Sequence, residues 1–330
     1  MKAIVCTKYG PPDVLQLSEV EKPVPKDDEV LVRVHAASVN KFDWIAMRGK
    51  PFLIRLSGFG LLKPKKRIPG ADVAGRVEAV GKNVKQLKPG DEVFGDLARW
   101  GLGGFAEYVC AHEDALALKP ANITFEEAAA VPMAAVTALQ GLRDKGKIQP
   151  GQKVLIYGAS GGVGTFAVQI AKSFGAEVTA VCSTKNLEIA RSIGADHVVD
   201  YTQEDFTQNG QHYDLIIAAN GYRPISAHKR ALSPKGIYVM TGGSGAQIFQ
   251  AMFLGPLISK IGSKKMGSLG AARPNKQDYA FLSGLLEAGK IVPFIDRRYT
   301  LSEVPEAFHY LGEGHARGKV VITVERDNST

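Results

Sequence analysis

A glycine-rich turn is the part of the chain best suited to chemistry. Ala159, Gly161 and Gly164 stand where a dinucleotide-binding G-x-G-x-x-G motif has its three glycines. The apolar run 154–157 precedes the turn, and an apolar pattern with helical spacing follows it. The second glycine lets the backbone approach a pyrophosphate, and the third lets the helix pack closely on its strand. We therefore expect the phosphates at the helix N-terminus, where they are held by Ser160, Gly161, Gly162, Val163 and Gly164.

The next strand indicates which dinucleotide is used. Enzymes that prefer NAD end this strand in an acidic residue that binds the ribose 2′-OH. Here the strand 177–182 is followed by Ser183, Thr184 and Lys185. Hydroxyls and a cation can bind a 2′-phosphate through charge-assisted hydrogen bonds worth about 1.5–3 kcal/mol each. The sequence therefore predicts NADPH over NADH. Ser183 and Thr184 could instead cap the next helix, and both roles can hold together.

Strands and helices alternate from residue 154 onward. Short apolar runs predict strands, and the clearest crossover helices span 166–174 and 184–193. Such alternation is typical of an α/β fold with a doubly wound parallel sheet. The candidate strands are 154–157, 177–182, 197–199, 215–218, 236–240 and 265–268.

The remainder of the chain reads as β-rich. Residues 1–121 contain many short alternating runs separated by Gly and Pro, which is typical of a compact barrel or sandwich. Near residue 122 the character changes, and Thr124 to Glu127 has the form of a capping box before a helix. The tail returns to short strands. We expect one domain from 1–121 and 272–330, a nucleotide-binding domain from 122–271, and the active site in the cleft between them.

Composition and charge restrict the class of protein. The chain has 330 residues, 45% of them hydrophobic and 22% charged, and no apolar run reaches the ~20 residues of a membrane span. Three widely spaced cysteines predict a reducing, cytoplasmic location. The net charge is +8, and four cations crowd into Lys63–Arg67. This loop is either solvated or contacts an anionic substrate, lipid surface or nucleic acid. Nucleic acid is the least favoured partner, because no aromatic residues are interleaved.

Seven motifs in order give the chain a family likeness. Together they resemble the zinc-independent quinone oxidoreductase branch of the medium-chain dehydrogenase/reductase superfamily. The resemblance implies a GroES-like β-rich catalytic domain completed by the tail, and a Rossmann domain between. It also implies a homodimer, with the strand at 236–240 as the candidate dimer edge. The motifs occupy residues 10–15, 38–43, 69–75, 89–93, 159–164, 194–201 and 314–321.

The resemblance also assigns site residues by position. It implies that Asn40 and Thr137 lie near the nicotinamide, and that Tyr201 lies with Lys185 near the adenosine phosphate. Further cofactor contacts are expected at the ends of later strands and from the tail. These are Asn220, Thr241, Gly242, Gly243, Arg317 and Lys319.

Zinc is not expected. Zinc enzymes of this superfamily have a cysteine near the position of Asn40, and Gly-His-Glu where this chain has Gly70, Ala71 and Asp72. Neither Asn40 nor Ala71 can serve as a normal zinc ligand. The four-cysteine structural lobe is also missing from the sequence.

Conjugate reduction suits a site without zinc. NADPH would deliver hydride to a quinone or an α,β-unsaturated carbonyl (enone), and the resulting anion would need only hydrogen-bond donors and a proton. Asn40 is a candidate donor, and Asp43 either takes part in catalysis or holds the turn. Two alternatives stay open at this point. One is an enoyl-thioester reductase, and the other is a non-enzymatic NADPH-binding protein of crystallin-like or nucleic-acid-binding type.

Overall fold

The computed structural model describes residues 1–52 and 54–324, and the chain forms two compact units. The β-rich unit comprises 1–133, 274–287 and the chain from 293 onward, whereas the α/β unit comprises 134–273 and 288–292. The first division thus falls at Met133–Ala134, later than the expected division at 121–122.

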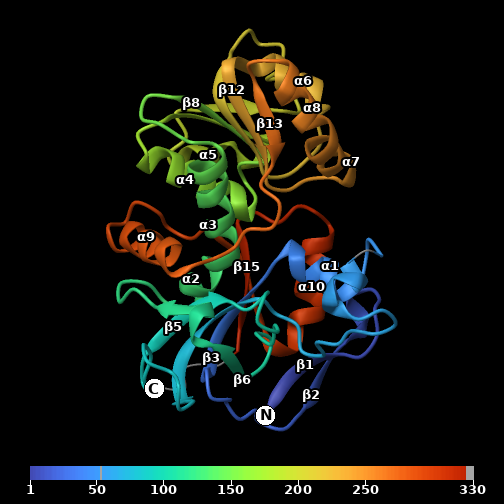
Figure 1. Cartoon of the computed structure of the whole chain (residues 1–330), viewed down its shortest axis with the longest axis vertical. Helices are drawn as coiled ribbons and strands as arrows, with labels where there is room; N and C mark the ends of the chain where they lie inside the picture. The colour runs from blue at the N-terminus through green and yellow to red at the C-terminus, as the bar shows by residue number, and fades with distance from the viewer. Residues whose placement is uncertain (53, 325–330) are drawn as a thin grey trace. The chain divides into compact units, whose positions relative to one another are not determined.

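A sheet of mostly antiparallel strands forms the β-rich unit (Figure 1). Its order is β14-β15-β3-β4-β5-β7, and β6 also pairs with β3. Alternating residues such as Val30, Val32 and Val34 point into its core. The strands are β3 (Glu29–Val39), β4 (Asp72–Val80), β5 (Glu92–Asp96), β6 (Tyr108–His112), β7 (Leu116–Leu118), β14 (Ile295–Thr300) and β15 (Lys319–Thr323), with a separate hairpin of β1 (Lys2–Cys6) and β2 (Leu15–Glu19).

The tail of the chain is built into this sheet. β15 pairs antiparallel with β3, with Val320 opposite Val39. β14 then extends the sheet in parallel with β15. In the described part of this unit four α-helices accompany the sheet, and the expected capping box at Thr124 and Glu127 begins the second of them. They are α1 (Lys41–Arg48), α2 (Phe125–Ala130), α9 (Lys276–Glu287) and α10 (Val304–Gly312).

Six parallel strands form the sheet of the α/β unit. Their order is β10-β9-β8-β11-β12-β13. β9 and β10 therefore lie on one side of β8, and β11, β12 and β13 lie on the other. This is the doubly wound Rossmann arrangement, with its switch point between β8 and β11. The mixed fold class predicted from the sequence is confirmed. The strands are β8 (Lys153–Tyr157), β9 (Glu177–Cys182), β10 (His197–Asp200), β11 (Tyr213–Ala218), β12 (Leu232–Met240) and β13 (Lys265–Ser268).

Crossover helices cover both faces of this sheet (Figure 1). α4 and α5 belong to the half that begins at β8, and α6 and α8 to the half that begins at β11. α3 leads into the unit and continues as the π turn η4 (Gln140–Lys145). The bounds are α3 (Pro132–Leu139), α4 (Gly162–Ser173), α5 (Leu187–Ser192), α6 (Ile225–Ala231), α7 (Gly245–Phe249) and α8 (Gly255–Ile261).

One expectation about the sheet is wrong. The strand at 236–240 was the candidate edge, but it belongs to β12, which pairs with β11 on one side and β13 on the other. The edges are β10 and β13. The strand at 265–268 was itself expected, but sequence patterns do not give the order of strands within a sheet. Among the described residues, no helix has the length and apolar character needed to cross a membrane.

Candidate functional site

The glycine turn has the geometry of a nucleotide-binding turn. β8 ends at Tyr157, Gly158 has φ +83°, and α4 begins at Gly162. A Cβ at Gly164 would lie 2.1 Å from the Gly158 oxygen, so only glycine fits where helix and turn meet. A Cβ at Gly161 would have its nearest neighbour at 3.7 Å. The protein itself leaves room there, which is what a bound pyrophosphate requires.

The N-terminus of α4 is suited to an anion. The helix has twelve residues, and no side chain caps its first turn. Its first amides have no partners within the helix and carry the positive end of the helix dipole. Asn186 donates to the Ser160 hydroxyl at 3.1 Å and to the Ser183 hydroxyl at 3.2 Å. These bonds fix the glycine turn beside the end of β9, where the adenosine end of a dinucleotide is expected.

The ends of β9 and β10 lie together. The Tyr201 N–H donates to the Cys182 oxygen at 3.1 Å, which holds Tyr201 next to the Ser183–Lys185 segment. Tyr201 is half exposed and Lys185 is exposed. Within the part of the chain that the structure describes, no ion pair involves Lys185. An ammonium without an acidic partner can bind a phosphate.

Asp200 is a residue that sequence reasoning missed. The Thr184 hydroxyl donates to its Oδ2 at 2.5 Å, and Thr202 donates to its Oδ1 through both N–H and hydroxyl. The hydrogen bond from Thr184, with those from Thr202, holds the pKa of Asp200 below its ordinary value. Thr184 is thus engaged in holding the loop, whereas the Ser183 side chain makes no cap bond to the following helix. The signal in the sequence that could have identified Asp200 is an acidic residue at the end of the next strand, β10.

The remaining predicted contacts of this unit lie at the same edge of the sheet. Asn220 follows β11, and a Cβ at Gly158 would lie 2.8 Å from its nitrogen, which places the two at the switch point. Thr241 and Gly242 follow β12 and donate to the Ala218 oxygen at 2.9 and 3.2 Å. The neighbouring Gly243 has φ +129°, and Thr137 lies nearly buried in α3. The carboxyl edge of the sheet therefore contains Asn220, Thr241, Gly242 and Gly243, whereas Thr137 belongs to α3.

A buried polar network occupies the β-rich unit. Asp72 lies at the start of β4 and is fully buried. Its Oδ2 accepts hydrogen bonds from Ser38 at 2.9 Å, Asn40 at 2.9 Å and Lys319 at 3.4 Å. Its Oδ1 accepts one from the Met133 N–H at 3.0 Å. All four partners donate to the Asp72 oxygens, and Lys319 forms an ion pair with this side chain at 3.4 Å.

Asn40 is engaged on both sides of its amide. Its Oδ1 accepts from the Lys319 Nζ at 2.5 Å, and its Nδ2 donates to Asp72 and to the Ser38 oxygen. Both Nδ2 hydrogens are therefore in use, and the side chain is 7% exposed. Lys319 is as deeply buried, whereas Arg317, two residues earlier, is exposed. The two tail residues that the sequence grouped together thus have different surroundings.

Asp43 has the geometry of a capping residue. Its Oδ2 accepts from the Asn40 N–H at 2.9 Å at the start of α1, and its side chain is fully buried. Its Oδ1 has no hydrogen-bond partner among the residues that the structure describes. Burial, with the neighbouring Asp72 carboxylate, raises the pKa of Asp43 to about 7. This arrangement matches the structural role that was the alternative to a catalytic one.

Asn40 and Asp72 do not form a zinc site. Asn40 and Asp72 offer an amide and a carboxylate, and the ammonium of Lys319 already supplies the positive charge between them. Ala71 has no donor atom. These residues do not fit zinc, which prefers thiolate and imidazole ligands. Across residues 1–52 and 54–324, no three His, Cys, Asp or Glu side chains come together as a metal-binding group.

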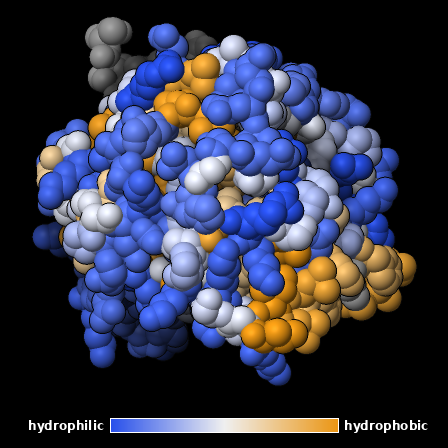
Figure 2. All heavy atoms as spheres, turned by 90° about the horizontal axis from the view of Figure 1, so that it is seen from above, coloured by the Kyte–Doolittle hydropathy of each residue, from blue (hydrophilic) through white to orange (hydrophobic). Residues whose placement is uncertain are grey.

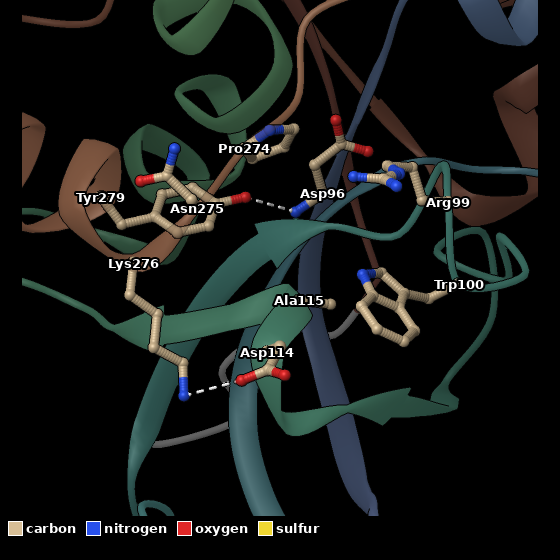
Figure 3. A pocket seen from close by; sticks show the side chains of 9 residues that line it. All are labelled: Asp96, Arg99, Trp100, Asp114, Ala115, Pro274, Asn275, Lys276 and Tyr279. Atoms are coloured by element: carbon tan, nitrogen blue, oxygen red, sulfur yellow. Dashed lines mark hydrogen bonds and ion pairs between the residues drawn. The ribbon is translucent and has the colours of Figure 1, made fainter.

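A cavity of about 300 Å³ lies elsewhere in the β-rich unit (Figure 3). Its polar groups are largely paired with one another: the Tyr279 hydroxyl accepts from the Asp96 N–H at 3.0 Å, and Lys276 pairs with Asp114 at 2.8 Å. Burial, with the nearby Asp72, raises the pKa of Asp96 to about 8. None of its lining residues was predicted to be functional. They are Asp96, Arg99, Trp100, Asp114, Ala115, Pro274, Asn275, Lys276 and Tyr279.

A Rossmann sheet and a GroES-like β-rich unit define the two-domain dehydrogenase class, and comparisons with known proteins agree. The family "Alcohol dehydrogenase GroES-like domain" matches residues 26–121, and "Zinc-binding dehydrogenase" matches 193–322. The chain belongs to the medium-chain dehydrogenase/reductase superfamily, among its quinone oxidoreductase-like members. The predicted resemblance is thereby confirmed.

Three similar proteins illustrate this membership. A 2-methylene-furan-3-one reductase of Solanum lycopersicum is 37% identical over 334 residues, which cover 98% of this chain and 79% of the relative. An NADPH-dependent alkenal/one oxidoreductase of Arabidopsis thaliana is 36% identical over 342 residues, with 98% and 79% covered. The structure of the quinone oxidoreductase from Coxiella burnetii superposes with a TM-score of 0.86 at 31% identity, covering 98% of this chain and 99% of that one.

Proposed function

We propose that this protein is an NADPH-dependent reductase that transfers hydride to quinones or α,β-unsaturated carbonyls. One observation carries the proposal: the carboxyl edge of the parallel sheet joins a helix N-terminus open to an anion with an exposed Lys185 that forms no ion pair in the described part of the chain. This is a site for a dinucleotide that carries an additional phosphate. The names of the two plant relatives and of the bacterial structure support the choice of acceptor.

Each cofactor residue has a separate task in this proposal. The amides of Gly162 and Val163 hold the pyrophosphate, and Gly161 leaves room for it. Lys185 supplies a positive charge to the 2′-phosphate, with Ser183 as a hydroxyl donor. Tyr201 borders the same position.

In the proposed reaction the β-rich unit only has to position the substrate and provide a polar environment. NADPH supplies the hydride when it is bound. The anion formed on the substrate needs a donor and a proton. Asn40, Asp72 and Lys319 form a fixed polar group whose members are hydrogen-bonded to one another, so they contribute by holding the local structure in place. Because both Nδ2 hydrogens of Asn40 are engaged, we assign Asn40 a positioning role. Asp43 holds the start of α1, and water provides the proton.

Zinc independence and the remaining partners are part of the proposal. The replacement of a metal by the Lys319 ammonium supports a reaction without zinc. The four-residue edge strand β13 supports a homodimer through its free side. We also retain a cytoplasmic location. The exposed cations of Lys63–Arg67 support contact of this loop with an anionic surface.

A substrate panel tests the function. NADPH oxidation is followed by absorbance with quinones, short enones and enoyl thioesters, and the matched control uses NADH with each acceptor. We expect turnover of quinones or enones with NADPH. Faster turnover of enoyl thioesters would make the protein an enoyl-thioester reductase. Tight NADPH binding without turnover of any acceptor would refute the reductase proposal and favour a non-enzymatic NADPH-binding protein.

A further inference from the structure

A long helix before the edge strand exposes its large apolar side chains. It runs through α7, the π turn η6 (Gln250–Leu254) and α8. Phe249, Phe253, Leu257 and Ile261 recur every four residues, and the rings of the two phenylalanines lie 4.8 Å apart. Apolar side chains gather at the lower right of the view from above (Figure 2). Between 38% and 90% of the surface is exposed for Ile248, Phe249, Met252, Phe253, Leu254, Leu257 and Ile261.

The opposite side of this helix faces the sheet with small residues and with Gln247 and Ile258. Ala251 and Gly255 are buried, and a Cβ at Gly255 would lie 2.7 Å from the Met266 oxygen of β13. The Ser259 hydroxyl accepts from the Met266 N–H at 2.8 Å. A helix on the surface of a protein normally turns its large apolar side chains inward. Here the small side faces the sheet, so the apolar side is no part of the core of this unit.

The surroundings of the helix are cationic. No Asp or Glu occurs between residues 215 and 273. Lys264 donates to the Lys229 oxygen at 2.7 Å, and the Ile225 N–H donates to Gln250 at 2.8 Å, so the cations of α6 belong to the same region. The Lys and Arg residues of this stretch are Arg223, Lys229, Arg230, Lys235, Lys260, Lys264, Lys265 and Arg273.

We propose that this apolar-cationic face, residues 248–265 with the cations of α6, docks on an anionic lipid bilayer. A helix with Phe and Leu on one side and lysines beside them can lie in the membrane interface, with its apolar side among the acyl chains. The lysines meet anionic headgroups. The contact is peripheral and goes beyond the reductase function.

Charge decides between a bilayer and a second copy of the chain. A symmetric dimer through the helix itself, as distinct from the pairing of β13 edges proposed above, would bring the cations of both copies into one interface. No acidic side chain from residues 215–273 is available to compensate them. An anionic membrane offers an apolar interior and negative charge together, so it complements both properties of the face.

Vesicle binding tests the proposal. The whole protein is sedimented with vesicles of phosphatidylcholine alone, or with added phosphatidylglycerol. We expect binding to the anionic vesicles, and at least tenfold weaker binding for Phe253→Ser/Leu257→Ser. Lys260→Glu/Lys265→Glu should lose about fivefold or more per lysine. In a separate Phe253→Trp variant, brominated lipids should quench the added tryptophan.

Two charge controls accompany these variants. Lys85→Glu/Lys88→Glu makes the same charge change on the β-rich unit and should bind like the unchanged protein. Lys63→Glu/Lys66→Glu examines the basic loop separately. The proposal is overturned if anionic vesicles do not bind the protein, or if binding depends on the loop and not on the helix variants. A dimer dissociated by Phe253→Ser/Leu257→Ser without vesicle binding would also overturn it, because the face would then join two copies.

Discussion

Removal of the Lys319 ammonium should destabilise the β-rich unit strongly. Lys319 is 3% exposed, donates to Asn40 at 2.5 Å, and is the positive charge beside the fully buried Asp72. Lys319→Met keeps the length of the side chain and leaves a buried carboxylate without a counter-charge. Breaking a buried pair in this way costs about 3–5 kcal/mol. Asp72→Asn in the same chain removes the stranded charge, so the double variant should recover about 2 kcal/mol or more of the loss.

Urea unfolding followed by tryptophan fluorescence measures this effect. Trp44 and Trp100 both belong to the β-rich unit, so the signal reports on the unit that contains the network. The matched control is Arg317→Met, since Arg317 is exposed and close in sequence. It should change the free energy of unfolding by about 0.5 kcal/mol or less. A loss below about 1 kcal/mol for Lys319→Met, or a double variant no more stable than the single one, would refute the reasoning.

Three further predictions concern single side chains. Lys185→Ala should weaken NADPH binding about 10- to 150-fold in calorimetric titration and leave NADH nearly unchanged, because only NADPH carries the 2′-phosphate; equal losses would contradict the assignment. His228 is fully buried, neither ring nitrogen has a hydrogen-bond partner within residues 1–52 and 54–324, and burial lowers its pKa to about 4. The unfolded chain therefore takes up this proton more readily, and about 3 kcal/mol of stability should be lost as the pH falls from about 6.5 to 4. In acid-unfolding curves His228→Phe should remove that loss of stability. If the stability of the variant had the same pH dependence as that of the unchanged protein, the assignment to His228 would be wrong. The raised pKa of Asp43 makes the free energy of unfolding fall as the pH rises, which is opposite to the effect of His228. The Asp43 carboxyl stays protonated in the folded state while the unfolded chain has lost the proton. Relative to the unchanged protein, Asp43→Asn should become more stable by about 1.4 kcal/mol per pH unit as the pH rises from about 4 to 7, and a pH-independent difference would show that Asp43 is not held neutral.

Local sequence patterns were sufficient to predict the strands and the glycine turn of the α/β unit. The strands expected at 177–182 and 265–268 have those bounds in the structure, because each is a run of consecutive residues between breaking signals. The glycine turn was also readable, since the roles of its residues follow from backbone geometry over a few positions. The start of the helix after it was set too late, at 166 rather than Gly162. Glycines at a helix N-terminus give no apolar signal.

Contacts between residues far apart in the chain could not be predicted from the sequence. Lys319 and Asp72 are 247 positions apart, and neither has a neighbouring pattern that points to the other. The sequence grouped Lys319 with Arg317 as a cofactor contact, whereas the structure pairs its side chain with Asp72 and Asn40. Likewise, periodicity shows that residues 249–261 form one apolar face, but it does not show whether the core or the surface receives it. Burial depends on what packs against a face, and that is a property of the whole fold.

The pairing of β15 with β3 has a consequence for how the protein is made on the ribosome. The α/β unit is continuous from 134 to 273 apart from a short later segment, so most of it can fold as soon as it emerges. Asp72 and Asn40 are synthesised early, yet the ammonium that neutralises Asp72 and donates to Asn40 arrives with residue 319. Until then the nascent β-rich unit exposes one side of β3 and carries an uncompensated carboxylate. The first part of the chain to be translated is therefore the last to reach its native state, and during synthesis it is the part most in need of chaperones.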